Sequence, residues 1–429
     1  MKILVAMSGG VDSTIAAYKL IKEGHEVIGV NFAFADTAGA NVDIVGAKHR
    51  EPALVEASLR ASRMGELCEP ELNVIAKKLG IKIIYRDFRS DFREKIITSF
   101  VRDYENGITP NPCALCNGIM KFEKLLQVMK EEACDMIATG HYANVVAVEE
   151  ASSVGVFLRA RSMGELCEPT RFAIKKSKNL QKDQSYMLYR LSQEQLSHII
   201  FPIGDMDKNE VREIAKSLGL SVADKKDSQD VCFVSDISYK EFIKRFEFGD
   251  DYREKIARGK LKEEEILEKP FFKKGEFVDT SGKVLGFHNG IINYTIGQRR
   301  GINIAFGERK FVVRIDVKKN QVVLGDNDDL QSSDFEIYDT VFSGMREEGL
   351  SNDKTLIAKL RYRHDGTPAT LVGTDEIVWA NLRDHRMSEL CEPRTFKFHL
   401  SSPVRAITPG QSAVFYDENN CIMFGGRII

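Results

Sequence analysis

Three cysteines stand where a thiol can act as a nucleophile. Cys113 and Cys116 form a Cys-x-x-Cys pair in TPNPCALCN (109–117), ahead of a helix-like stretch, and Cys232 lies far away in DSQDVCF (227–233). A helix N-terminus stabilises a nearby thiolate, so we expect the pair to be activated as nucleophiles. Such a pair can also be redox-active, bind a metal or be two inert thiols, and a lone Cys232 is more often a small core residue.

A second reactive feature is the turn SGGVDS (8–13), which follows an apolar run and opens a helix-like one. Its glycines let the backbone approach a ligand, and free N–H groups at a helix N-terminus favour anions. The lysine that a Walker P-loop needs after its last glycine is absent. Asp12 beside a phosphate implies a Mg²⁺ between them, or Asp12 is simply an N-cap. A tight turn without a ligand is the remaining alternative.

A parallel sheet is needed to position these groups. Strand-like and helix-like segments alternate in the first half of the chain, with strands at 2–6, 27–32, 81–85 and 134–138 and helices at 13–22, 72–79 and 117–132. This rhythm predicts an α/β fold whose parallel sheet is covered on both faces. Ligands of such sheets bind beyond the carboxyl ends of the strands, where residues 8–13 lie.

The rhythm changes from about Phe201. A helix is predicted at 207–218, the stretch 236–274 is highly charged with little strand character, and short alternating runs such as 310–317 and 355–362 follow. The pattern predicts a small central domain and a C-terminal antiparallel β-barrel. We place an N-terminal sheet domain at 1–200, a central, linker-like domain at 201–300 and the barrel at 301–429.

Composition limits the class of protein. The chain has 429 residues, 43% of them hydrophobic, and a net charge of −2. No run approaches the roughly 18 apolar residues of a membrane helix, and Met1-Lys2 leads into too short an apolar run for a secretory signal. We therefore expect a cytoplasmic protein without a membrane partner. Its eight cysteines are more typical of free, catalytic or metal-binding thiols than of disulfides.

One short element occurs three times, as LRASRMGELCEP (59–70), LRARSMGELCEP (158–169) and LRDHRMSELCEP (382–393). The copies have no fixed period, so they do not form a solenoid. Cys68, Cys167 and Cys391 are candidate metal ligands, but Cys-Glu-Pro lacks paired-ligand spacing. We favour an element inserted three times into tolerant surface loops.

Six motifs occur in an order that points to one family. They are SGGVDS (8–13), TPNPCALCN (109–117), ATGHYA (138–143), KDQSY (182–186), DSQDVCF (227–233) and YTIGQRRG (294–301). SGGVDS resembles the PP-loop of the ATP pyrophosphatases, and the ordered set resembles the tRNA-specific 2-thiouridylases over nearly the whole chain. The resemblance implies that residues 1–200 are a Rossmann-like PP-loop catalytic domain and that the central domain at 201–300 binds tRNA. It also implies that ATP adenylates the C2 oxygen of the wobble uridine (U34) in tRNA and that a persulfide then delivers sulfur, giving 2-thiouridine, AMP and pyrophosphate.

The resemblance also implies roles for individual residues. Cys232 carries the persulfide, Cys116 is its partner nucleophile, and Cys113 replaces an aspartate that many members have as a proposed acid/base. ATP, with Mg²⁺, is expected at Ala6, Met7, Ser8, Gly9, Gly10, Val11, Asp12, Ser13, Phe32 and Gly140. The tRNA is expected at Asn111, Pro112, Cys113, His141, Lys182, Asp183, Gln184, Arg361, Tyr362 and Gln411.

The basic stretch KKSKNLQKDQSY (175–186) suits phosphate contact and base stacking, although by itself it is more typical of a solvated loop. The implied partners are tRNAs with a modifiable wobble uridine, such as those for Glu, Gln and Lys, and an upstream sulfur-relay protein or cysteine desulfurase. Two alternatives stay open. Cys113, Cys116 and Cys232 could hold a [4Fe–4S] cluster with one free iron position. A synthetase acting on a small molecule would explain the PP-loop, but leaves the cysteines and the barrel without a role.

Overall fold

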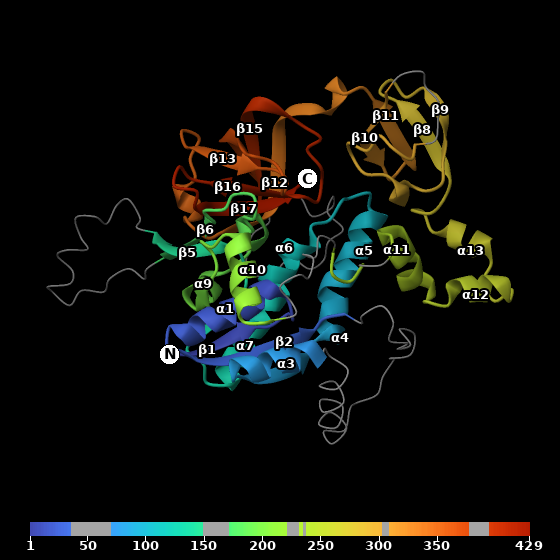
Figure 1. Ribbon diagram of the computed structural model, residues 1–429. Helices are drawn as coiled ribbons and strands as arrows, with labels where there is room; N and C mark the ends of the chain where they lie inside the picture. Colours follow the sequence, from blue (N-terminus) through green and yellow to red (C-terminus); the bar gives the residue numbers. More distant parts are fainter. Residues whose placement is uncertain (36–69, 149–170, 221–230, 235–236, 303–308, 377–393) are drawn as a thin grey trace.

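A five-stranded parallel sheet forms the first half of the molecule (Figure 1). The computed structural model describes residues 1–35, 70–148, 171–220, 231–234, 237–302, 309–376 and 394–429. Within them the strand order is β3-β2-β1-β4-β7, with every neighbouring pair parallel. The strands are β1 (Lys2–Ala6), β2 (Glu26–Ala33), β3 (Lys82–Asp87), β4 (Met136–Ala138) and β7 (Ile199–Ile200). The predicted parallel sheet is confirmed.

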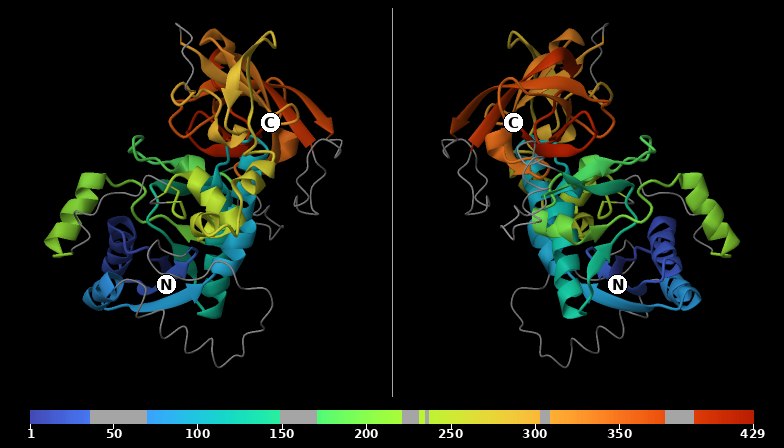
Figure 2. Two further views of the ribbon diagram at one scale, coloured as in Figure 1. Left: turned by 90° about the vertical axis from the view of Figure 1, so that its right-hand side faces the viewer. Right: turned by 90° about the vertical axis from the view of Figure 1, so that its left-hand side faces the viewer.

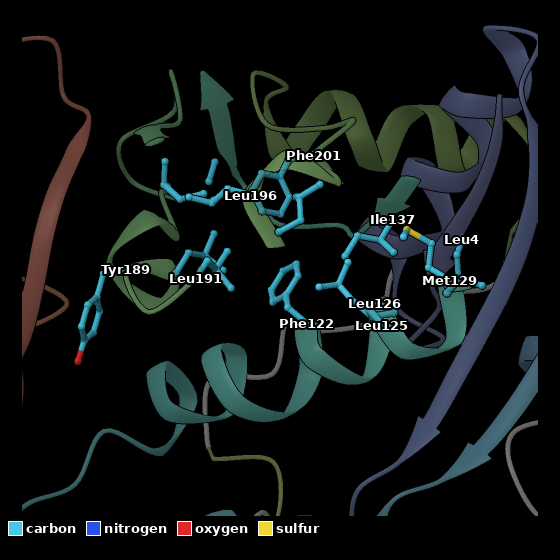
Figure 3. Packing of buried hydrophobic residues seen from close by; sticks show 14 of the residues in the cluster. Leu4, Phe122, Leu125, Leu126, Met129, Ile137, Tyr189, Leu191, Leu196 and Phe201 are labelled. Atoms are coloured by element: carbon cyan, nitrogen blue, oxygen red, sulfur yellow. The ribbon is translucent and has the colours of Figure 1, made fainter. Parts of the chain in front are cut away.

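Helices cover both faces of this sheet, because successive strand residues point to opposite sides. Leu4 of β1 packs with α7 (Phe122–Glu131) and α9 (Gln193–Ser197). Its neighbours Ile3 and Val5 pack with α1 (Val11–Lys22), α3 (Pro70–Leu79) and α10 (Lys208–Ser217). Figure 3 shows the first of these two cores, where Phe122 and Leu126 of α7 point toward the sheet.

Two composite helices lead from the sheet toward the barrel. The first joins α4 (Arg89–Phe92), the π-helical turn η1 (Arg93–Ile97) and α5 (Thr98–Glu105). The second joins α6 (Pro112–Cys116), the π-helical turn η2 (Asn117–Lys121) and α7. The helix predicted at 117–132 is thus confirmed, but it begins earlier, at Pro112. Such π-turns occur often at functional sites.

Three helices precede a small mixed sheet in the central region. The charged stretch after residue 236 folds into α11 (Tyr239–Phe248), α12 (Tyr252–Ala257) and α13 (Glu263–Glu268). The sheet has the order β10-β11-β8-β9 and is built from β8 (Gly275–Asp279), β9 (Val284–His288), β10 (Phe311–Asp316) and β11 (Gln321–Gly325). The boundary predicted at 300/301 falls between β9 and β10, so strands on both sides of it build this sheet.

Six antiparallel strands close a barrel at the C-terminus, as predicted. They are β12 (Gln331–Phe342), β13 (Thr355–Lys359), β14 (Thr367–Glu376), β15 (Arg394–Arg405), β16 (Ser412–Tyr416) and β17 (Ile422–Ile428). Phe398, Phe415 and Phe424 stack inside it, with ring centroids 4.2 to 5.9 Å apart. The antiparallel strands β5 (Ala143–Val148) and β6 (Arg171–Lys176) form a separate pair. This pair contacts the barrel through an isolated β-bridge between Lys175 and Cys421.

The barrel lies directly over α6 and the loop before it, and both views in Figure 2 show it stacked on the catalytic sheet domain. Among the described residues, no helix is long and apolar enough to cross a membrane. The three repeat copies lie outside the described residues, apart from Pro70, which begins α3. The prediction that they are surface insertions therefore stays a prediction.

Candidate active site

The PP-loop is a tight connection between β1 and α1. Gly9 has a φ of +71°, a backbone conformation that favours glycine. Gly10 is the N-cap of α1 and has no side chain that could occupy the N–H groups of the first turn. Because these N–H groups lack intrahelical partners, they form a site for an anion such as a phosphate.

Side chains around the PP-loop fix its shape. The Ser13 hydroxyl accepts a hydrogen bond from the Ser8 N–H at 3.2 Å and lies 3.3 Å from the Ser8 hydroxyl. From the neighbouring strand β2, the Asn31 amide donates to the Met7 carbonyl at 2.7 Å. Asn31 is a supporting residue that the sequence motifs did not single out.

Asp12 is held by groups from two other elements. Lys208, the first residue of α10, donates to both carboxylate oxygens at 2.8 and 2.7 Å, and the Tyr142 hydroxyl donates to Oδ1 at 2.8 Å. The Lys208 side chain is 7% exposed. Lys208 lies 196 residues from Asp12 in the sequence, and its ammonium group pairs with the Asp12 carboxylate. No local pattern could have revealed this pairing.

Gly140 closes the PP-loop from the side of β4. A methyl group at this position would lie 2.6 Å from both the Asp12 carbonyl carbon and the Ser13 nitrogen, so only glycine permits this approach. Phe32 lies at the end of β2, where it packs edge-on against Phe34 and Phe88 at 5.4 and 5.1 Å. The residues predicted to bind ATP therefore gather at the carboxyl ends of adjacent strands.

The three predicted cysteines lie close to one another. Cys113 and Cys116 are on α6, Cys232 is in the segment 231–234, and all three are free thiols. Cys113 is exposed, but desolvation by the protein around it and the neighbouring Cys232 raise its pKa, against the opposing charge of Lys121. Burial raises the pKa of Cys116 to about 12; the Lys121 charge opposes this shift, and both other cysteines reinforce it. The fold thus brings Cys232 to the Cys-x-x-Cys pair, as the resemblance implied.

The two thiols of the pair lie at opposite ends of α6: Cys113 lies in its first turn, as expected for a thiol at a helix N-terminus, and its activation there stays a prediction. Cys116 is the last of only five residues in α6, and the chain continues without a break into η2. Burial outweighs the Lys121 charge, and it raises the pKa of the Cys116 thiol. At neutral pH Cys116 is protonated in the RNA-free chain.

This raised pKa predicts the pH dependence of alkylation. Because a thiolate is the reactive form and the pKa of Cys116 is about 12, its alkylation by iodoacetamide should rise about tenfold per pH unit from pH 7 to 9. The rate is measured by mass spectrometry of the Cys116 peptide, with a small free thiol as the control, whose rate levels off above its pKa of about 8.5. A plateau for Cys116 below pH 9 would contradict the prediction.

An aromatic cluster holds the segment that carries Cys232. The next residue, Phe233, packs against Phe92, Phe100 and Phe242 with ring centroids 5.6, 5.1 and 5.3 Å apart. Phe233 also shares a hydrophobic cluster with Cys116. Since an aromatic side chain buries a large apolar area, Phe233 fixes the position of its neighbour Cys232 beside α6.

His141 lies between the PP-loop and the cysteines. It follows Gly140, and its ring packs between Phe122 and Phe201, each with a centroid 5.8 Å away. Its Nδ1 is 2.6 Å from the Thr139 hydroxyl. Burial, assisted by the Lys121 charge, lowers the pKa of His141 well below its usual value, so the imidazole is neutral at pH 7.

Several residues predicted to contact tRNA make contacts inside the protein. The buried Asp183 carboxylate accepts from the Ser185 hydroxyl at 2.7 Å, and the Gln184 side chain accepts from the Tyr142 N–H at 3.0 Å. Tyr362 donates to the Asp183 carbonyl at 3.1 Å. The same holds for Asn111, Arg361 and Gln411, which bond to Ser412, Arg405 and the loop 109–110. Contact with tRNA stays a prediction for this set.

The side chains do not gather in the way that a metal cluster requires. In the described part of the chain, which includes Cys113, Cys116 and Cys232, no three or more His, Cys, Asp or Glu side chains converge to hold a metal ion. The cysteine trio therefore does not fit a [4Fe–4S] cluster in this conformation. Asp12, already bonded to Lys208 and Tyr142, fits poorly as a direct Mg²⁺ ligand.

A small cavity lies beside the cysteine helix, with a volume of about 20 Å³. Its wall includes Asn111, Pro112 and Leu115 together with Arg190 and Arg427. The Arg190 Nε atom is buried without a hydrogen-bond partner. Because both arginines are paired with aspartates, at 2.8 Å to Asp339 and 2.7 Å to Asp103, the cavity suits one water molecule rather than an anion.

Comparisons with known proteins agree with the geometry. Three family models match in succession: a tRNA methyl transferase HUP domain over residues 1–236, a tRNA methyl transferase PRC-barrel domain over 264–326 and an aminomethyltransferase beta-barrel domain over 336–429. A U34-tRNA thiolase from Methanococcus maripaludis, with its [4Fe–4S] cluster, is 20% identical and covers 62% of this chain and 73% of that one, but its TM-score of 0.26 is too low to bear on the argument.

Full-length relatives are more informative. The tRNA-specific 2-thiouridylase MnmA of Clostridioides difficile is 37% identical over 428 residues, which span 100% of this chain and 98% of the relative. The tRNA-specific 2-thiouridylase MnmA 2 of Caldanaerobacter subterraneus is 39% identical over 432 residues, spanning 100% of this chain and 97% of the relative. With the PP-loop, the cysteine trio and the barrel in place, the chain belongs to the family of tRNA-specific 2-thiouridylases.

Proposed function

We propose that this protein is an ATP-dependent sulfurtransferase that converts the wobble uridine of tRNA into 2-thiouridine. The observation that carries the proposal is that one lysine, Lys121, is near both the three cysteines and His141, the residue that follows Gly140 beside the PP-loop. The charge of Lys121 acts on Cys113, Cys116 and Cys232 and also on His141. His141 adjoins Gly140, which touches the first turn of the PP-loop helix. Adenylation and sulfur transfer can thus take place on one bound base.

The first step is adenylation of the base. The C2 oxygen of the uridine attacks the α-phosphorus of ATP, and pyrophosphate leaves from the PP-loop. The N–H groups at the α1 N-terminus hold the phosphates, and Lys208 neutralises Asp12 beside them. Mg²⁺ that accompanies ATP would screen the charge of the phosphates beside the α1 N-terminus.

The second step is transfer of sulfur. The terminal sulfur of a Cys232 persulfide attacks C2, and AMP leaves with the former C2 oxygen. The Cys116 thiolate then attacks the Cys232 sulfur and breaks its bond to the transferred sulfur, which leaves a Cys116–Cys232 disulfide. A thiol reductant restores the two cysteines, and a sulfur-relay protein or cysteine desulfurase reloads Cys232. Cys113 is available to protonate or deprotonate the base.

Proton transfer must precede the second step, because the pKa of Cys116 is raised to about 12 in the RNA-free chain. We propose that tRNA supplies the change that activates it. A flipped uridine that enters between His141 and α6 brings a polar edge to the thiols and changes their solvation. The substrates we propose are the tRNAs for Glu, Gln and Lys, contacted at predicted positions such as Pro112, His141 and Lys182.

Two other activities are less well supported. The family-model description names methyl transfer, but the full-length relatives are thiouridylases, and thiolation gives all three clustered cysteines a role. A synthetase for a small molecule needs the PP-loop alone. Since the cysteine trio does not converge as metal ligands, no step here uses an iron–sulfur cluster.

The proposal predicts 2-thiouridine that depends on both ATP and tRNA. Full-length protein is incubated with unmodified tRNA, ATP, Mg²⁺, a thiol reductant and a cysteine desulfurase with cysteine, which supplies sulfur at the persulfide level, and the nucleosides are analysed by mass spectrometry. We expect 2-thiouridine only in the complete mixture, together with stoichiometric AMP. Release of AMP that is indifferent to tRNA would favour the small-molecule synthetase, and a methylated nucleoside in place of 2-thiouridine would favour methyl transfer.

A further inference from the structure

The loop before α6, the helix that carries Cys113 and Cys116, is hydrogen-bonded to a turn of the C-terminal barrel. Thr109 donates its N–H to the Pro409 carbonyl at 3.1 Å. The Gln411 amide donates to two carbonyls of the loop, Thr109 at 3.0 Å and Pro110 at 3.2 Å. These bonds join residues about 300 positions apart in the sequence.

The same turn is fixed to the barrel on its other side. The Gly410 N–H donates to the Ile428 carbonyl at 2.8 Å, and the Ile428 N–H donates to the Gln411 carbonyl at 2.9 Å. Gly410 has a φ of +88°, and a methyl group there would lie 2.2 Å from Cγ2 of Ile108 and 2.8 Å from the Thr109 oxygen. The turn and the loop are therefore in direct backbone contact, and only glycine fits at position 410 without displacing the loop.

The contact continues into α6 through one side chain. The Asn111 amide nitrogen donates to the Ser412 hydroxyl at 3.1 Å, while its oxygen accepts from the Ala114 N–H at 3.4 Å as the N-cap of α6. Ser412 is 1% exposed, so its side chain is immobilised in the interior. One amide thus connects the barrel to the helix that carries Cys113 and Cys116.

We propose that the barrel turn Thr408–Ser412 is a positioning element for the nucleophile helix α6, with Gln411 as its central residue. Pro110 and Pro112 give the loop few backbone N–H groups of its own, so bonds from the barrel decide where the loop lies. In this role the barrel turn fixes the position and orientation of α6, and thereby the position of the Cys116 thiol relative to Cys232. The consequence for catalysis rests on the proposed function. The hydrogen bonds that join Gln411 and Pro409 to the loop before α6, named the Gln411 clamp, do not depend on it.

The test replaces Gln411 with alanine in the full-length chain and first examines the RNA-free protein. Hydrogen exchange of the Thr109 and Ala114 amides should accelerate about tenfold or more, because local opening becomes easier. Alkylation of Cys113 should change in rate, with Gln331→Ala at the start of β12 as the matched control. A second variant, Gly410→Ala, displaces the same loop by a steric clash, and its melting temperature shows whether the fold survives.

Steady-state kinetics then separate positioning from tRNA binding. If Gln411 positions α6, kcat should fall about tenfold while KM for tRNA stays within about twofold, since a misplaced nucleophile slows chemistry without weakening binding. Unchanged exchange, unchanged kcat, or a raised KM at constant kcat would overturn the proposal, and the last result would assign Gln411 to tRNA binding. If the wild-type protein lacks thiolation activity, the proposed function fails, but the exchange and alkylation results still decide whether the clamp exists.

Discussion

Replacing Cys232 with alanine should lower the rate of 2-thiouridine formation about a thousandfold or more below that of the wild type, because in the proposed mechanism no other group carries the transferable sulfur. Replacing Cys116 should reduce turnover to a similar extent for a different reason. Cys232 then still accepts a persulfide, but the S–S bond to the transferred sulfur is not broken. Mass spectrometry of nucleosides measures the product, and intact-protein mass spectrometry detects the persulfide.

The chain offers matched controls for both cysteine variants. Cys134 and Cys421 are buried thiols in the catalytic core and the barrel core, away from the cysteine trio. Their alanine variants should keep near-normal activity and lose only the modest stability of a small core truncation, about 1 kcal/mol. Full activity in Cys232→Ala would refute the persulfide role. A Cys116→Ala variant that cannot accept a persulfide at all would mean that Cys116, rather than Cys232, is loaded first.

Lys208→Ala should reduce tRNA-dependent pyrophosphate release on the order of a hundredfold. Lys208 is the buried cation that holds both oxygens of Asp12 at the N-terminus of α1. Without it the Asp12 carboxylate faces the phosphates of ATP unneutralised, and in a poorly hydrated site such repulsion is large. Release is followed with labelled ATP, and a thermal melt confirms that the variant is folded.

The double variant Lys208→Ala/Asp12→Asn distinguishes repulsion from simple structural damage. If the defect is the uncompensated charge, removing it should restore part of the rate, so the two substitutions are not additive. Lys216→Ala, an exposed lysine on the same helix, serves as the control and should leave release within about twofold. A double variant no better than Lys208→Ala would show that Lys208 acts on ATP or on folding, and not through Asp12.

The sheet could be predicted from the sequence because its signal is local. Apolar runs of strand length alternate with amphipathic helices, and the observed β1 matches its predicted bounds, Lys2–Ala6. The charged stretch after residue 236 was harder to interpret. Its helices pack through widely spaced residues such as Ile243 and Ile266, which leave a weak pattern among many charges.

The pKa of Cys116 shows the limit of local reasoning. Its position in a helical stretch says nothing about burial, which raises the pKa of this thiol and which depends on segments far away in the chain. Phe233, for example, is more than 100 residues away in the sequence and packs in the same hydrophobic cluster as Cys116. The Asp12–Lys208 pair and the Gln411 clamp are other long-range contacts, joining residues 196 and 302 positions apart.

The sequence by itself determined which chemistry is present: a PP-loop that lacks the Walker lysine, a Cys-x-x-Cys pair, a distant third cysteine, and their order along the chain. It did so because motif residues and hydrophobic periodicity are properties of short segments. Only the tertiary structure decided the protonation of these groups and their positions relative to one another. Contacts between distant segments place Lys208 on Asp12, bury Cys116 so that its pKa rises, and hold α6 against the barrel turn. Such contacts exist only after the chain has folded.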